Sequence, residues 1–186
     1  MTTLSIFDQN QPEHARTVTE DPSEIRELLA TQGIRFEQWP TRDLPADATQ
    51  KQILEVYSEE VARLKEECGF QTADVVSLNP DNPQKEAFRQ KFLDEHTHSE
   101  DEVRFFVRGQ GLFYLHFGDQ VYAVMCQKND LISVPDGTRH WFDMGPEPKF
   151  TCIRLFSNPE GWVADFTGED IASRLPRYEA LAEAGG

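Results

Sequence analysis

From residue 47 to residue 67, apolar residues recur at three- and four-residue steps, the spacing of an amphipathic helix, and Gly69 follows as a stop. A shorter helix is predicted from Asp21-Pro22, where aspartate can cap and proline fits the first turn, to Gly33. A third helix is expected to open at Asn82-Pro83. Alternation of apolar and polar residues between these helices predicts two strands, over residues 34–39 and 73–78.

The pattern changes after about Phe92, where short apolar runs alternate with turn residues such as Gly109-Gln110-Gly111. Regular short strands with tight turns are typical of an antiparallel sandwich or barrel. Helical signals return near the C-terminus, around residues 169–175 and 177–182. The strands in this region are predicted over residues 112–117, 121–126, 131–134, 140–142 and 150–156.

These elements predict a single domain of 186 residues, a length that suits one hydrophobic core. The predicted fold class is mainly β with helical flanks. We expect residues 92–157 to form the barrel core. Residues 1–91 are expected to be mixed α/β decoration, and residues 158–186 a helical and loop segment.

Charge narrows the classes of partner. Acidic residues outnumber basic ones by 33 to 18, and the formal net charge is −15. Phosphate backbones and anionic membrane surfaces need a basic face, so neither nucleic acid nor a membrane is expected as a partner. Three cysteines without a repeated spacing, and no signal-like or membrane-length apolar run, predict a reduced cytoplasmic protein. No long apolar stripe is visible, which favours a monomer.

The stretch DEHTHSEDEVRFFVRG, from Asp94 onward, carries candidate chemistry. His96 and His98 lie two apart, so an extended backbone directs both imidazoles to one face. Glu102 shares that parity if the backbone stays extended. His140 follows a proline-glycine turn that can direct its ring toward the same place. Three imidazoles and one carboxylate suit a first-row divalent metal such as Fe(II) or Ni(II), with two octahedral positions left for substrate or oxygen.

The polarity of this stretch alone favours a plainer interpretation. Histidines among acidic residues are usually solvated, and the apolar face of the strand after Glu102 would then be the core. On that interpretation Glu102 and Arg104 face solvent. The distant His140, preceded by a suitable turn, is what favours a metal centre instead.

If the ligand face lies inside a barrel, Arg104 points inward beside Glu102. A buried arginine needs an anionic partner, and a divalent ion with one carboxylate leaves positive charge for a small anionic substrate. Phe106 and Phe142 share the inward parity and are candidates for a pocket wall or for core packing. Trp162 is a candidate lid, or an ordinary packing residue. His116 lies in mid-strand and is expected to be structural.

The spacing His-x-His, three residues, Glu, six residues, Gly is the first motif of the cupin superfamily. Pro-x-Gly, two residues, His is the end of the second. This chain departs from the motifs at positions that shape turns: Gln90 stands where a glycine usually opens the first, Asn129 opens the second, and Met144 stands where asparagine is common. The resemblance implies a double-stranded β-helix, or jelly-roll barrel.

The segment from His96 to Gly109, with residues 135–141 and the helical flanks, resembles the acireductone dioxygenases of methionine salvage. The resemblance covers nearly the whole chain. It implies that the ligands are His96, His98, Glu102 and His140, and that Arg104 helps hold the anionic substrate.

Enzymes of that family cleave 1,2-dihydroxy-3-keto-5-methylthiopentene with O2. The resemblance implies formate and the 2-keto acid precursor of methionine as products with iron. With nickel it implies methylthiobutyrate, formate and carbon monoxide. Two other functions remain open from the residues themselves: a metal-dependent cupin isomerase or epimerase that needs no O2, and a non-catalytic ligand-binding cupin.

Overall fold

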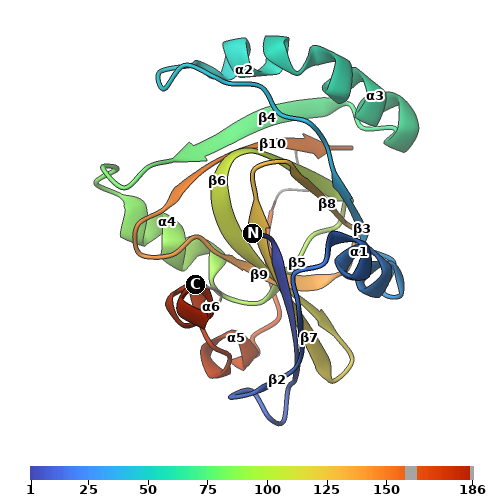
Figure 1. The fold of residues 1–186 in the computed structure, drawn as a ribbon, viewed down its shortest axis with the longest axis vertical. Coiled ribbons are helices and arrows are strands. Elements are labelled where there is room, and N and C mark those ends of the chain that lie inside the picture. Colours follow the sequence, from blue (N-terminus) through green and yellow to red (C-terminus); the bar gives the residue numbers. More distant parts are fainter. Residues whose placement is uncertain (158–162, 185–186) are drawn as a thin grey trace.

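The computed structural model of the chain describes residues 1–157 and 163–184, which form one sheet of eleven strands flanked by six helices (Figure 1). The strands are β1 Thr3–Asp8, β2 Ala15–Thr19, β3 Arg35–Gln38, β4 Thr72–Leu78, β5 His96–Thr97, β6 Glu102–Phe117, β7 Gln120–Gln127, β8 Asp130–Val134, β9 Arg139–Asp143, β10 Lys149–Phe156 and β11 Asp165–Phe166. The helices are α1 Pro22–Ala30, α2 Gln50–Val56, α3 Ser58–Cys68, α4 Lys85–Phe92, α5 Ile171–Arg174 and α6 Tyr178–Ala184. The predicted fold class, mainly β with helical flanks, is confirmed.

Strand β6 organises the barrel because it belongs to both of its layers. Its first half pairs with β8 and β10, and its second half pairs with β7 and β9, all antiparallel. The change of partners falls near Gly109, which has φ +71° and which a register shift against β10 precedes. A Cβ at Gly109 would lie 1.9 Å from the carbonyl oxygen of Lys149, so only glycine allows the two strands this close. The turn expected at Gly109-Gln110-Gly111 is therefore wrong: the chain bends there within one strand.

The N-terminal region contributes more strands to the sheet than its local pattern predicts. β1 pairs with both β2 and β7. β3 pairs with β8, and β4 with β10. The strands expected over residues 34–39 and 73–78 are thus present as β3 and β4, whereas β1 and β2 were not expected.

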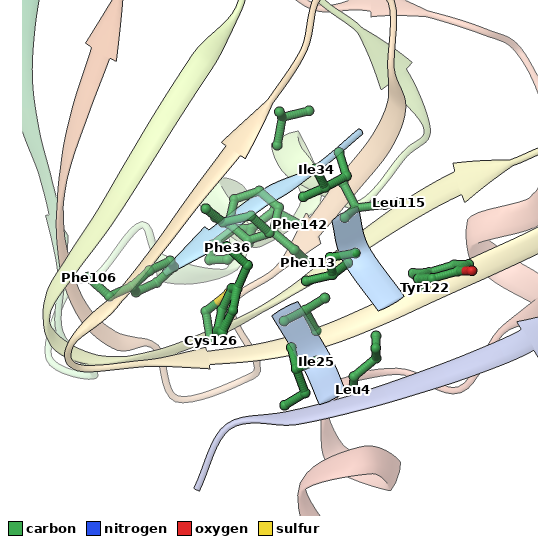
Figure 2. Close-up of a cluster of buried hydrophobic side chains, with 14 of the residues drawn as sticks. Leu4, Ile25, Ile34, Phe36, Phe106, Phe113, Leu115, Tyr122, Cys126 and Phe142 are labelled. Carbon is green, nitrogen blue, oxygen red and sulfur yellow. The ribbon is translucent and has the colours of Figure 1, made fainter. Parts of the chain in front are cut away.

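Two hydrophobic layers bury both faces of the first half of β6. Phe106 belongs to the cluster between the barrel layers, which Figure 2 shows with Phe113 and Phe142 nearby. Val103 and Phe105 face the other way and pack with residues of α2, α3 and β10. In Figure 1 these two helices lie over β4 and β10. A strand covered on both sides has no solvated face. Its pattern of polar residues therefore cannot show which face points to solvent.

Capping and buried side chains explain where the N-terminal helices begin and end. Asp21 accepts a hydrogen bond from the backbone N–H of Ser23 (2.9 Å) at the start of α1, as predicted. The long helix expected over residues 47–67 is instead two helices, α2 and α3, separated at Tyr57. Tyr57 is fully buried, and its hydroxyl bonds the backbone N–H and carbonyl of Arg42 at 2.7 and 3.2 Å. No helix among the described residues is long and apolar enough to cross a bilayer.

Candidate metal centre

His96 and His140 face each other on neighbouring strands. β5 and β9, both labelled in Figure 1, are antiparallel. His96 and His140 are register partners in this pair. Register partners project to the same side of a sheet, and here the ring centroids are 4.5 Å apart. Both residues are 3% exposed, so each imidazole lies inside the barrel rather than in an acidic surface turn.

His98 completes a group of three. Its ring centroid is 5.0 Å from that of His96 and 5.0 Å from that of His140. One nitrogen from each histidine lies within 4.8 Å of the other two. Two nitrogens bonded to one ion at about 2.1 Å can be at most about 4.2 Å apart, so small ring movements would complete a shared site.

Backbone carbonyls fix the proton on each ring. Nδ1 of His96 lies 2.8 Å from the carbonyl oxygen of Asp94, and Nδ1 of His140 lies 2.7 Å from that of Thr138. Nδ1 of His98 lies 3.3 Å from the carbonyl oxygen of Val163. A carbonyl oxygen can only accept, so Nδ1 must donate, and the lone pair remains on Nε2. This is the usual outer arrangement around histidines that bind a metal.

Burial keeps two of these imidazoles neutral. It lowers the pKa of His96, and it lowers the pKa of His140 to about 3, an effect to which the neighbouring His96 adds. A neutral imidazole can bind a metal without first losing a proton. The site therefore fits a divalent cation through its donor atoms and through their protonation.

Glu102 lies beside the histidines, but the backbone between His98 and Glu102 is not extended as expected. Residues 99–101 do not continue the strand, and Glu102 enters the site as the first residue of β6. Its Oε2 lies 3.7 Å from Nε2 of His98, while its Oε1 accepts a hydrogen bond from Nε of Arg104 (2.8 Å). Burial opposes the charge on Glu102, but Arg104 and the nearby histidines hold the pKa of its carboxyl down at about 2.

Arg104 points inward, as its parity predicts. It is 5% exposed, and its guanidinium carbon lies 5.1 Å from the ring centroid of Phe113 and 5.3 Å from that of Phe142. Among the described residues, Glu102 alone accepts a hydrogen bond from it. Arg104 thus carries a buried charge beside Glu102, and it is not in the described lining of the cavity next to His96 and His98.

The two loops that present the ligands are tied together. The backbone N–H of Gly137 donates to the carbonyl of His98 (2.9 Å), and that of Asp136 donates to Oδ1 of Asp101 (2.8 Å). These bonds join the turn before His140 to the loop after His98. Nothing in the local sequence pattern indicates them, because the two loops come from different motifs.

A cavity of about 720 Å³ opens beside His96 and His98. Its described lining includes two basic residues, Lys91 and Arg154, and no carboxylate, although the chain as a whole is strongly acidic. The apolar part of the lining comes from β4, α4 and the segment around β11: Val75, Val76, Leu78, Phe88, Phe92, Val163, Ala164 and Phe166. The ring of Phe166, a residue that the sequence pattern did not single out, lies 5.7 Å from that of His96.

The aromatic residues expected near the site have different surroundings. Phe106 and Phe142 are buried in the barrel core, with ring centroids 6.5 Å apart, and neither is in the described lining of the cavity. Phe142 contacts the guanidinium of Arg104, and Phe106 packs against Phe142. Trp162 lies outside the described residues.

Known proteins share this chain's sequence and architecture. A family model described as the ARD/ARD' family matches residues 3–164. An acireductone dioxygenase of Marinobacter nauticus is 81% identical over 98% of each chain, and one of Hahella chejuensis is 64% identical over 98% of this chain and 99% of its own.

A solved structure agrees with these matches. It is that of acireductone dioxygenase from Bacillus anthracis with cadmium ion in the active center, and it covers 89% of this chain and 98% of its own. Its TM-score is 0.77 at 30% identity, which supports the cupin-type barrel expected from the motifs. With a family model spanning most of its length and relatives this similar from end to end, the chain belongs to the ARD/ARD' family.

Proposed function

We propose that this protein is a metal-dependent dioxygenase that cleaves the acireductone 1,2-dihydroxy-3-keto-5-methylthiopentene with O2 in methionine salvage. The observation that carries the proposal is the group of three histidines, each with Nδ1 bonded to a backbone carbonyl, beside an open cavity. The names of the relatives that match over the whole chain point to the same reaction.

The residues proposed to hold one divalent ion are His96, His98, His140 and Glu102. The histidines would bind through Nε2 and Glu102 through Oε2, because Arg104 already occupies Oε1. When bound, the ion supplies positive charge that orients a deprotonated enediol and offsets its charge. Iron or nickel fits this set of donors.

Arg104 is proposed to favour the anionic form of the substrate. Its charge is buried beside Glu102, and its pKa is raised: burial alone would lower it, and the Glu102 carboxylate more than offsets this. Its side chain also holds the Glu102 carboxylate in place, which leaves Oε2 directed toward the histidines. A low-polarity position strengthens both interactions.

The cavity suits the rest of the substrate. Its apolar walls from β4, α4 and β11 can cover a methylthioethyl chain. Lys91 adds a positive charge to the lining, whereas the charge of Arg154 is paired with Asp74. We further propose that the protein acts as a monomer in the cytoplasm.

The identity of the metal is proposed to decide the products. With iron, the products would be formate and the 2-keto acid. With nickel, they would be methylthiobutyrate, formate and carbon monoxide. The chain's own residues bind and orient the substrate in either case, so both metals would use the same ligands and the same cavity.

Purified protein, stripped of metal and reloaded with Fe(II) or Ni(II), tests the proposal. Mixing with anaerobically generated acireductone and then admitting O2 should bleach the substrate absorbance faster than in metal-free protein, with matching O2 uptake. Product analysis should find carbon monoxide with nickel alone. Fully loaded protein that consumes no O2 would overturn the proposal, and turnover without O2 would favour an isomerase.

A further inference from the structure

The strand that carries His96 is very short. β5 has two residues, and its described backbone pairing consists of one register pair with β9 and two with β11. So few ladder bonds restrain a strand weakly. A ligand on such a strand needs further contacts if its ring is to stay opposite His140.

Glu95, directly before His96, supplies those contacts. It is 1% exposed, and its contact with His116 places its side chain on the face away from His96. Its Oε2 lies 2.5 Å from Nδ1 of His116, and its Oε1 accepts a hydrogen bond from the hydroxyl of Thr167 (2.9 Å). The backbone N–H of Thr167 donates to the carbonyl of Glu95 (3.1 Å), so Thr167 binds this residue twice.

His116 reaches Glu95 across a strand. The order of strands is β11-β5-β9-β6, so β5 and β6 flank β9 on opposite sides. In β6, Leu115 is the register partner of His140, and His116 is that of Arg139. Leu115 lies in the core between the layers, so His116 points outward, as Glu95 does. The contact between Glu95 and His116 therefore spans β9 on the back of the sheet, behind the two facing histidines.

The contact joins a buried carboxylate and a buried imidazole. Nε2 of His116 lies 3.0 Å from Oε1 of Gln9, while its Nδ1 faces the carboxylate. A carboxylate oxygen can only accept, so Nδ1 of His116 donates to Glu95. His116 is 5% exposed, and charge-assisted bonds between buried partners are strong and directional. Removing the imidazole leaves the Glu95 carboxylate buried without this donor.

We propose that Glu95 and His116 form a positioning pair for the metal centre: their buried hydrogen bond fixes β5 to β6 across β9 and holds His96 opposite His140. Neither side chain touches the metal or the substrate. The inference rests on the proposed ligand set, and it adds two residues that act through His96.

Metal affinity is the measurement that tests the pair. Glu95→Gln keeps the size of the side chain and an acceptor for Thr167, and it removes the charge. His116→Gln removes the imidazole. Each variant should bind Ni(II) or Co(II) about tenfold more weakly than the wild type, the effect typical of residues that orient a ligand. The double variant should bind no more weakly than the weaker single variant, because the two residues act as one unit.

A matched control separates positioning from general stability. Asp130 is also a fully buried carboxylate, and it accepts hydrogen bonds from Thr2, Gln38 and the backbone of Gln127, away from the histidines. Asp130→Asn should lower the Tm yet leave the dissociation constant for Ni(II) unchanged, when all titrations run well below the Tm of each variant. The absorption spectrum of bound Co(II) should shift in Glu95→Gln and stay the same in Asp130→Asn.

Each alternative outcome has a distinct meaning. Wild-type affinity and an unshifted Co(II) spectrum in both Glu95→Gln and His116→Gln would overturn the positioning pair. An equal loss of affinity in Asp130→Asn would also overturn it, because the effect would then be general. Wild-type protein that binds neither ion, or binds it no better than a His96→Ala variant, would instead overturn the proposed metal centre.

Discussion

His96 and His140 are register partners on antiparallel strands, with ring centroids 4.5 Å apart, although each belongs to a different sequence motif. In each, the N–H at Nδ1 donates a hydrogen bond to the backbone carbonyl two residues earlier, so the two rings repeat one local arrangement. The proposed site therefore exists only when both motifs fold against each other.

The third histidine gives a direct test of the ligand set. We expect His98→Ala to lower metal occupancy strongly, because it removes one of three converging nitrogens. His14→Ala is the matched control, since His14 is exposed and lies at the N-terminus. Elemental analysis after equal metal loading measures both. A fully loaded His98→Ala variant would remove His98 from the ligands.

Substitution of Arg104 should separate substrate binding from metal binding. We expect Arg104→Ala to retain metal while kcat/KM for the acireductone falls by about a hundredfold, the usual effect of losing a buried charged group that stabilises a reacting anion. Arg104→Lys should recover part of the loss, because it restores charge without the planar fork.

Metal content decides how that result is interpreted. Loss of metal in Arg104→Ala would mean that the arginine acts through Glu102, whose Oε1 it holds. Unchanged kinetics with full metal would show that Arg104 has no part in turnover.

Lys91 tests whether charge draws the substrate into the cavity. It lies in the cavity lining, where the described residues include no carboxylate. Lys91→Glu should lower kcat/KM by about fivefold at low ionic strength, and the difference should shrink as salt screens it. Lys51→Glu changes the net charge equally, from an exposed position on α2. Equal effects of the two substitutions would contradict local steering.

The buried thiols predict a loss of stability at alkaline pH. Burial raises the pKa of the Cys152 thiol from its ordinary 9.0 to about 11. Between these values the folded protein keeps a proton that the unfolded chain has lost, so stability falls as pH rises through this window and is unaffected below it. The free energy of unfolding lost across this window is about 3 kcal/mol.

Urea unfolding at several pH values measures this effect. Cys152→Ala should be less stable than the wild type near neutral pH, because it leaves a cavity. Its free energy of unfolding should nonetheless fall less steeply between about pH 9 and about pH 11. Parallel curves for the two proteins would show that the thiol does not cause the slope.

Motif spacing predicts the part of the site that depends on residue type and strand parity. The spacing identifies five candidate residues, and the structure places them close together: His96, His98, His140, Glu102 and Arg104. It does not predict the carbonyl acceptors of the rings or the contact of Glu95 with His116, because these depend on how distant strands pair. Both faces of β6 are buried, so its polarity could not show which face carries the chemistry.

Local patterns also fail where tertiary contacts decide the backbone. Apolar spacing continues through Tyr57, yet the helix ends there because the side chain is buried against Phe105 and bonded to Arg42. Asn129 shows the opposite case: it has φ +88°, so the asparagine that opens the second motif adopts a backbone that glycine usually provides.

Strand β6 carries Glu102 and Arg104 on its inner face and, after its bend, His116 on its outer face. A single residue inserted between Arg104 and His116 would exchange the inner and outer sets beyond the insertion. Gains and losses of residues during evolution should therefore be tolerated in the surface turns and eliminated from this strand. The length of β6, as much as the identity of its side chains, is a heritable requirement of the site.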